Sequence, residues 1–153
     1  KDSLFKLSLN GSEGKFGFLD IIENYGSTNA ADIATYSAGM AYYNLNDFEK
    51  SINYLQKFNS EDEILNALAL GVIGDSFAEL DQLDDALDSY KSAIISTENQ
   101  FTTPKFLLKA GNISNLLGKK SDALKFYERI KKDYAKSPES NLIDIQIGKN
   151  SIN

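Results

Sequence analysis

Apolar residues recur along the chain at helical spacing, and short polar breaks divide them into segments. Within a segment, large side chains follow one another at i, i+3, i+4 and i+7, as on the buried face of a helix. The segments come in pairs separated by the dipeptides Asn46-Asp47, Asp81-Gln82 and Gly118-Lys119. The first residue of each dipeptide tolerates a left-handed backbone and so ends a helix. The pattern predicts an all-α fold of antiparallel helix pairs.

The same unit occurs three times. Matching stretches begin at Gly39, Gly74 and Gly111, and each reaches a small residue twelve positions later. Successive glycines lie 35 and 37 residues apart, so we expect two extra residues in a loop around 98–103. A period near 35 residues indicates a stack of helical repeats. The stripe that each second helix should bury consists of Phe48, Ser51, Ile52, Leu55 and Phe58, then Leu83, Ala86, Leu87, Tyr90, Ala93 and Ile94, then Ala123, Leu124, Tyr127 and Ile130.

Six positions of each unit resemble the tetratricopeptide repeat. In that repeat they hold, in order, a bulky residue, an apolar residue, glycine, an aromatic residue, alanine and a second aromatic residue. These positions are Thr35, Ala38, Gly39, Tyr42, Ser51 and Leu55; Leu70, Ile73, Gly74, Phe77, Ala86 and Tyr90; and Leu107, Ala110, Gly111, Ser114, Ala123 and Tyr127. The main departures are Thr35 in a bulky position and Ser114 in an aromatic one. The resemblance implies a right-handed superhelical array of antiparallel helix pairs.

The resemblance divides the chain into one domain of about three repeats. Its parts are an arm and leading half-repeat (1–31), repeats at 32–65, 66–103 and 104–137, and a capping helix (138–153). For residues 1–14 the sequence predicts a short helix or an extended arm. Ser137 and Pro138 form the expected start of the last helix, as N-cap and first helical residue. Leu142, Ile143, Ile145 and Ile147 should then cover the open end of the stack.

The amino-acid composition disfavours several classes of function. The chain has no histidine and no cysteine, which removes the commonest general base, the thiolate nucleophile and the commonest zinc ligands. Its net charge of −6 disfavours nucleic acid and anionic membrane surfaces as partners. We therefore expect no enzyme activity, no catalytic residue, no metal and no cofactor.

The acidic groups Glu61-Asp62-Glu63 and Asp84-Asp85 are expected at helix amino termini, where carboxylates interact favourably with the helix dipole. They lack the ligand pattern of a calcium loop. The glycine-containing segment 11–15 lacks the spacing of a phosphate-binding loop and is interpreted as a flexible loop.

First helices of this family line a concave groove, and the resemblance implies that a partner peptide or helix binds there. The residues it places on the wall include Ile33, Tyr36, Met40, Tyr43, Asp75, Glu79, Lys105, Lys109, Asn112 and Asn115. Tyr36, Met40 and Tyr43 form one stripe that suits an adaptable apolar pocket. The alternative is that this stripe packs on the amino-terminal arm.

Lys105 and Lys109 lie one helical turn apart and could meet a carboxylate. They match two of five positions of the clamp with which relatives hold chaperone tails. Tyr36, Met40 and Val72 occupy the other three, so binding of a chaperone tail is not expected.

The leading hypothesis is a non-enzymatic scaffold that binds another protein. Self-association is the alternative, and a small helical hydrolase is a weaker third. Segments 70–93 and 125–134 resemble bacterial membrane-anchored tetratricopeptide proteins similar to the ancillary subunit of the Sec translocon. That resemblance implies an anchor preceding Lys1, a periplasmic location and a role in envelope protein secretion or assembly. A cytoplasmic location is the other possibility.

Overall fold

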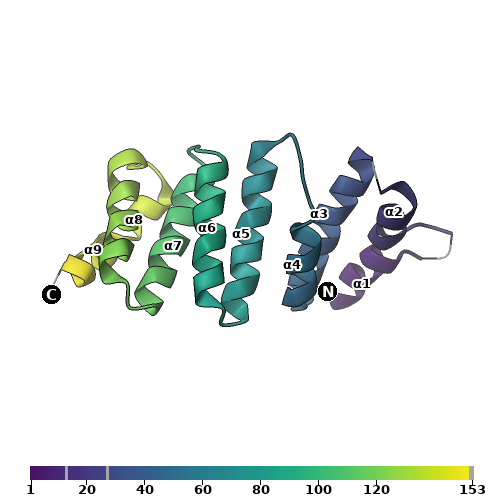
Figure 1. The fold of residues 1–153 in the computed structure, drawn as a ribbon, viewed down its shortest axis with the longest axis horizontal. Helices are drawn as coiled ribbons and strands as arrows, with labels where there is room; N and C mark the ends of the chain where they lie inside the picture. Colours follow the sequence, from purple (N-terminus) through teal and green to yellow (C-terminus); the bar gives the residue numbers. More distant parts are fainter. Residues whose placement is uncertain (13, 27, 152–153) are drawn as a thin grey trace.

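The computed structural model describes residues 1–12, 14–26 and 28–151, which form a row of helices along one long axis (Figure 1). In chain order the helices are α1 (Asp2–Asn10), α2 (Phe18–Tyr25), α3 (Asn29–Asn44), α4 (Phe48–Leu55), α5 (Glu63–Glu79), α6 (Leu83–Ser96), α7 (Thr103–Leu116), α8 (Lys120–Asp133), the 3-10 turn η1 (Pro138–Asn141) and α9 (Asp144–Ser151). Over these ranges no β-strand is formed, and Ser12 and Lys15 make one isolated bridge. The expected all-α solenoid is confirmed.

Three helix pairs, α3–α4, α5–α6 and α7–α8, form the body of the array. The turn inside each pair contains one residue with a positive φ: Asn46 at 60°, Asp81 at 59° and Gly118 at 73°. These are the left-handed positions expected from the three dipeptides. Asparagine, aspartate and glycine adopt this conformation at the least cost, so each turn ends the first helix sharply and reverses the chain.

The repeated glycines bring the two helices of each pair together. A Cβ atom built on Gly74 would lie 2.6 Å from the Tyr90 ring, and one built on Gly111 would lie 2.4 Å from the Tyr127 ring. At Gly39 the corresponding neighbour is Leu55, at 2.5 Å. Real Cβ atoms do not approach so closely, so a larger residue at any of these glycines would require the facing side chain to shift.

The second helices bury most of the stripe expected from their sequence, and they differ in length. The half-buried members of the stripe on these helices are Phe48, Leu83 and Leu124. α4 has 8 residues and ends at Leu55, whereas α6 has 14. Phe58 therefore lies in a loop rather than on the helix. That loop is held by Asn66 of α5, whose side chain accepts a hydrogen bond from the Ser60 amide and donates one to the Ser60 carbonyl.

The prediction of a loop insertion around 98–103 is wrong, because the two extra residues do not lengthen that loop. The loop 97–102 is no longer than the loop 56–62, and the extra residues extend α6 instead. Asn99 organises the loop 97–102, because its Oδ1 accepts hydrogen bonds of 2.8 Å from the amides of Phe101 and Thr102.

The amino-terminal segment forms a helix, α1, followed by α2. Leu9 of α1 is buried with Ala38 and Ala41 of α3, and Phe5 packs against the same cluster. α2 adds Phe18, Leu19 and Ile22 to it. Both helices thus cover the free side of the first pair.

The carboxyl-terminal end begins as expected but does not continue as one helix. The Ser137 hydroxyl caps the Ser140 amide at 3.2 Å, yet residues 138–141 form only the turn η1, and α9 starts at Asp144. The break between them turns Ile143 into the core, where it is fully buried, and Ile147 packs beside it. Leu142 and Ile145 stay 63% and 69% exposed, so only two of the four expected apolar residues cover the stack.

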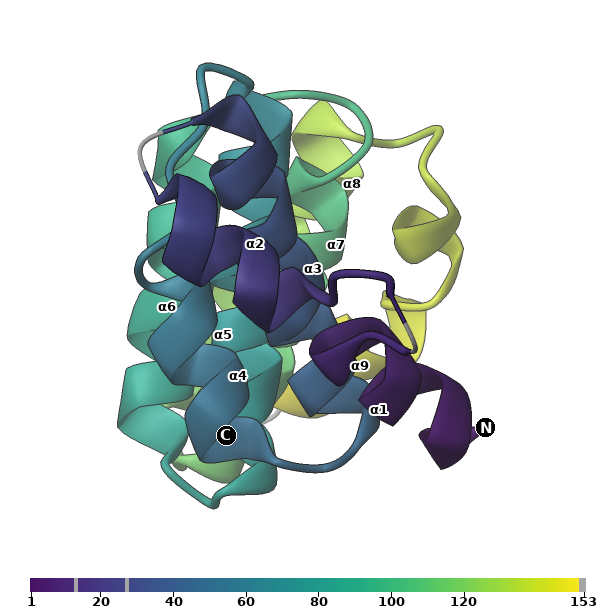
Figure 2. The same cartoon turned by 90° about the vertical axis from the view of Figure 1, so that its right-hand side faces the viewer.

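The array is bounded by α1 and α9. Seen end-on, α2, α4 and α6 lie toward one side of the molecule and α1 and α9 toward the other (Figure 2). Among the described helices none is long and apolar enough to cross a membrane.

Candidate functional site

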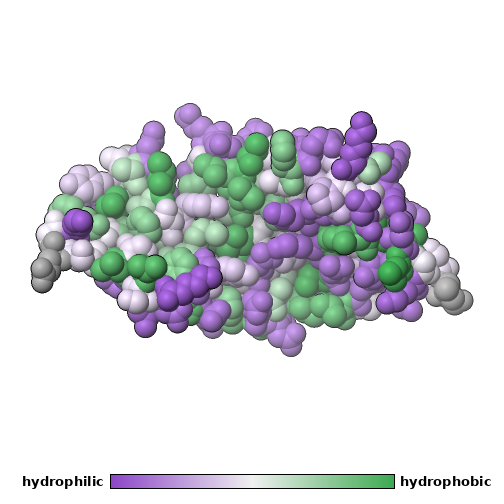
Figure 3. Space-filling view, turned by 180° about the vertical axis from the view of Figure 1, so that it is seen from behind, coloured by the Kyte–Doolittle hydropathy of each residue, from purple (hydrophilic) through white to green (hydrophobic). Residues whose placement is uncertain are grey.

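The first helices α3, α5 and α7 carry all ten candidate residues. Viewed from behind the orientation of Figure 1, the surface shows polar patches between apolar ones rather than one apolar strip (Figure 3). The ten residues form an apolar group on α3 and a polar group on α5 and α7. We call the surface formed by these ten residues the wall.

The apolar stripe of α3 is covered within its own repeat, not by the arm. Tyr36 packs on Phe58, with ring centroids 5.1 Å apart, and Tyr43 meets Phe48 edge-on at 5.7 Å. α1 instead packs on the side of α3 that carries Ala38. Tyr36, Met40 and Tyr43 are all half-buried, so each offers only part of its surface to a partner.

Asp75 is the centre of a polar cluster on the wall. Its carboxylate accepts hydrogen bonds from Lys109 Nζ at 2.5 and 2.6 Å and from the Tyr90 hydroxyl at 2.5 Å. Lys109 Nζ also lies 5.7 Å from the centre of the Tyr90 ring. The pair joins α5 to α7 across neighbouring repeats, and Tyr90 of α6 reaches it past Gly74.

Burial and, to a smaller extent, the nearby carboxylates raise the pKa of two tyrosines in or near this cluster. Burial raises the pKa of Tyr90, and its hydrogen bond to Asp75 and the negative charge there raise it further. Burial also raises the pKa of Tyr43, with additional contributions from the charges of Asp75 and Glu79. Both phenols therefore stay protonated, and both can donate hydrogen bonds, at any physiological pH.

A second polar cluster repeats this arrangement one repeat further on. The Tyr127 hydroxyl donates to Asn112 Oδ1 at 2.8 Å and accepts from Asn115 Nδ2 at 3.0 Å. Asn112 follows Gly111 as Asp75 follows Gly74. Two of the four wall residues expected in the third repeat, Asn112 and Asn115, are thus brought together through a tyrosine of the second helix.

The roles of Tyr90 and Tyr127 were missed from the sequence, where both were assigned only to the buried stripe. The sequence did contain a signal for these roles. In the first repeat the same position is Leu55 and the residue after the glycine is Met40, whereas the later repeats pair tyrosine with aspartate or asparagine.

Lys105 and Lys109 do not act as two equivalent lysines. Lys109 is engaged by Asp75, while Lys105 is exposed and forms no ion pair among the described residues. Any carboxylate of a partner on this part of the wall would therefore meet Lys105 first.

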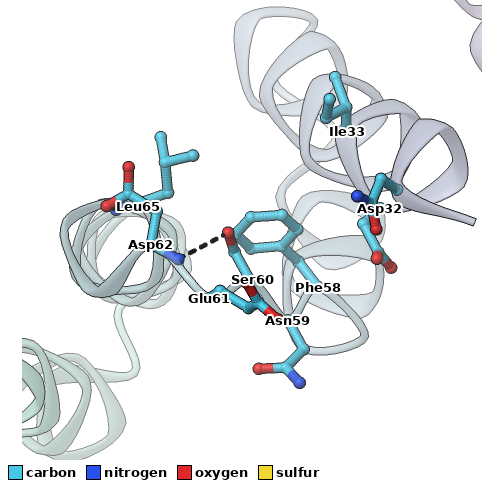
Figure 4. A pocket seen from close by; sticks show the side chains of 9 residues that line it. Asp32, Ile33, Phe58, Asn59, Ser60, Glu61, Asp62 and Leu65 are labelled. Carbon is cyan, nitrogen blue, oxygen red and sulfur yellow. Dashed lines mark hydrogen bonds between the residues drawn. The ribbon is translucent and has the colours of Figure 1, made fainter.

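A hollow of about 560 Å³ opens at the amino-terminal ends of α3 and α5 (Figure 4). Ile33 and Asp32 border it from α3, and Asp62 and Leu65 from α5. Phe58 lies between them on the connecting loop. Ile33 is 64% exposed, which makes it the most accessible apolar residue of the wall.

The acidic groups have the structural roles expected for them. Asp62 is the N-cap of α5, and its Oδ1 accepts from the Ile64 and Leu65 amides at 2.9 and 3.2 Å. Asp84 and Asp85 lie in the first turn of α6. Among the described residues no group of three or more acidic side chains is placed to hold a metal ion.

The geometry defines a class, a solenoid of helix pairs whose first helices present a mixed polar and apolar wall. Two stretches of the chain, residues 34–63 and 106–137, match models described as tetratricopeptide repeat. They cover most of the first and third helix pairs, and the α5–α6 pair lies between them with the same turn and glycine. Together these findings support a tetratricopeptide-repeat protein. No curated protein matches the chain.

Tetratricopeptide repeats are in general protein-interaction scaffolds without catalytic activity, because stacked repeats offer an extended surface rather than an enclosed reaction site. The two matched repeats therefore indicate a protein-interaction scaffold in this general sense.

Proposed function

We propose that the wall binds an extended segment or a helix of a partner protein. The observation that supports this proposal is that α1 packs on the far side of α3 and leaves exposed wall residues on all three first helices. Ile33, Glu79, Lys105 and Asn112 are exposed and belong to three successive repeats.

The distribution of side chains gives the segment a direction. Its apolar end lies over α3, where Ile33 and the hollow beside Phe58 accept a bulky side chain. Its other end lies over α7 and carries a carboxylate or amide that pairs with Lys105, Asn112 or Asn115. Because the contacts are apolar and neutral along most of the wall, affinity is modest and depends only weakly on salt.

Photo-crosslinking from single positions tests this proposal. A photoreactive amino acid replaces Ile33, Lys105 or, as the control, Ile95, which is 83% exposed on the second helix α6. The same partner should be crosslinked from positions 33 and 105, not from 95, and Lys105→Glu should weaken capture from position 33. Crosslinking of a partner from position 95 alone would contradict the proposal.

This design avoids substitutions at Tyr36 and Tyr43. Their rings pack on Phe58 and Phe48, so truncation to alanine would also disturb the repeat itself. Loss of capture would then not distinguish a binding role from a packing role.

Self-association is the second candidate, and the exposure of Leu142, Ile145 and Leu4 at the two ends of the array favours it. Sedimentation over a range of concentrations would show a dimer that Ile145→Lys abolishes. Ile147 is unsuitable for this test, because it packs against the core.

We further propose that this scaffold assists secretion or assembly of envelope proteins from the periplasmic face of a bacterial membrane. Support comes from the resemblance of segments 70–93 and 125–134 to membrane-anchored relatives. Protease protection of the full-length protein in spheroplasts tests it, since a periplasmic domain is digested while a cytoplasmic one is protected.

A further inference from the structure

Ser114 occupies a position that the other two repeats fill with an aromatic ring. It lies three residues after Gly111, as Tyr42 follows Gly39 and Phe77 follows Gly74. Tyr42 stacks on Tyr54, with centroids 5.2 Å apart, and Phe77 packs against two core clusters. In the third repeat the short side chain of Ser114 takes this position and cannot make the corresponding aromatic contact.

A hollow of about 330 Å³ lies at this position, between α6 and α8. Leu87 and Phe126 line it with apolar surface. Ser114 contributes to its lining and is fully buried, yet its Oγ has no hydrogen-bond partner among the described residues. Buried hydroxyls are nearly always hydrogen-bonded, so an unpartnered one beside a hollow points to a group that enters from outside.

Cationic side chains border the hollow. Lys91, Lys119 and Lys125 line it together with a single carboxylate, Asp122. Each lysine is paired with an aspartate, Lys91 with Asp88 at 3.6 Å, Lys119 with Asp84 at 2.8 Å and Lys125 with Asp122 at 2.9 Å. These pairs are exposed to solvent, so a carboxylate of a partner can compete with them at little cost.

The two sides of the hollow differ in charge: α6 carries three aspartates, Asp84, Asp85 and Asp88, against one lysine, whereas the segment of α7 and α8 is basic. Residues 104–136 contain nine lysines and arginines against three acidic residues, although the whole chain is acidic. α8 also begins beside the hollow, and its N-cap Lys119 provides no side-chain acceptor for the free amides there. Negative groups are thus favoured on the α8 side of the hollow.

We propose that the hollow over Ser114 binds a tyrosine side chain of an acidic segment in a partner protein. The ring lies between Leu87 and Phe126, where it replaces the aromatic residue that the repeat lacks, and its hydroxyl pairs with Ser114 Oγ. Carboxylates on both sides of the tyrosine meet Lys119 and Lys125. This site lies between second helices and does not depend on the wall.

A blocked synthetic peptide with a central tyrosine between aspartates and glutamates is the probe, and fluorescence anisotropy gives its affinity. Replacing the tyrosine by alanine should weaken binding at least about tenfold, as for loss of a buried aromatic anchor. Ser114→Phe fills the hollow as Phe77 does in the second repeat, so it should abolish binding without lowering the melting temperature. Ser114→Ala should remove the preference for a tyrosine over a phenylalanine peptide.

A matched pair of charge variants tests the basic border. Lys125→Glu should weaken binding of the acidic peptide, whereas Lys132→Glu, an exposed residue of the same helix outside the hollow, should leave it near the wild-type value. If Ser114→Phe fails to fold, these two variants and the alanine peptide still decide the question. Equal binding of the tyrosine and alanine peptides, or displacement of the peptide by inorganic phosphate alone, would overturn the proposal.

Discussion

The two junctions between successive repeats are built differently. Three ion pairs cross the junction of the second and third repeats: Asp75–Lys109, Asp84–Lys119 and Glu98–Arg129, at 2.5, 2.8 and 2.6 Å. No ion pair among the described residues crosses the junction of the first and second repeats, which is apolar around Tyr36 and Phe58. The hydrogen bond between the Ser76 and Ser51 side chains there is long, at 3.4 Å, and the Asn66 side chain bonds the Ser60 backbone. The large hollow of Figure 4 opens at this first junction.

The difference follows from how charge is distributed along the sequence. Residues 63–98 contain eight acidic residues and one lysine, and the next repeat is strongly basic. The two repeats therefore attract each other, while the first and second are both acidic. The period of glycines and turns specifies the shape of every repeat, but charges at the variable positions decide how firmly neighbours are joined.

Removing Tyr90 should have the largest effect on the second junction. Its ring is buried against Gly74, stacks on Phe106 with centroids 6.4 Å apart, and supports the Asp75–Lys109 pair. Tyr90→Ala should cost about 3–5 kcal/mol of unfolding free energy, the usual range for truncating a buried aromatic residue. Urea unfolding measures it, with Tyr25→Ala as an exposed control. A loss below about 1 kcal/mol would contradict this packing role.

Asp75→Asn should have an intermediate effect. The carboxylate is only 21% exposed and Lys109 34%, so the substitution leaves a partly buried ammonium group without its counter-ion. We expect a loss of about 1–2 kcal/mol. Asp84→Asn breaks a more exposed pair at the same junction and should cost about 0.5 kcal/mol or less. Similar losses for both would show that burial does not distinguish the two pairs.

Glu98 makes the second junction sensitive to acid. Hydrogen bonds from Tyr134 and Arg129, and the charge of Arg129, lower the pKa of Glu98 in the folded protein. A lowered folded pKa means that this stabilisation is complete above the unfolded value, near pH 4.3, and is lost as the pH falls through the folded pKa. Melting temperatures measured from pH 7 to 3 should fall less steeply for Glu98→Gln than for the wild type. Parallel curves would exclude a contribution from Glu98.

Much of the fold could be predicted because its signals are local. Asn46, Asp81 and Gly118 end helices through their own backbone preferences, and the glycines report close packing at a fixed distance along the chain. The end of α4 at Leu55 was not predicted. The loop that follows it is held by hydrogen bonds between Ser60 and Asn66 of the next helix, a contact that helical periodicity does not reveal. The hollow over Ser114 could be located only partly: the missing aromatic residue is visible in the sequence, but the lysines around it come from two separate helices.

The residues of the candidate wall were named from the sequence, but the contacts that they make with one another were not. Asp75 and Lys109 were both assigned to it, yet their mutual pairing depends on the offset between neighbouring repeats. That offset is readable once the repeats are aligned. Lys109 lies two residues before Gly111, and Asp75 one residue after Gly74, so the corresponding pair at the first junction is Met40 and Val72.

Transferring the ion pair to the first junction would test whether charge alone separates the two junctions. Met40→Asp and Val72→Lys should each destabilise the protein, because each places an unpaired charge on a half-buried position. The double variant should be more stable than the sum of the single losses predicts, with a coupling energy of about 0.5 kcal/mol. Leu55 stands where Tyr90 supports the natural pair, so adding Leu55→Tyr should increase the coupling. Additive single effects, measured by urea unfolding of all four forms of the cycle, would show that the first junction holds these positions too far apart and that its geometry, as well as its charge, differs from that of the second.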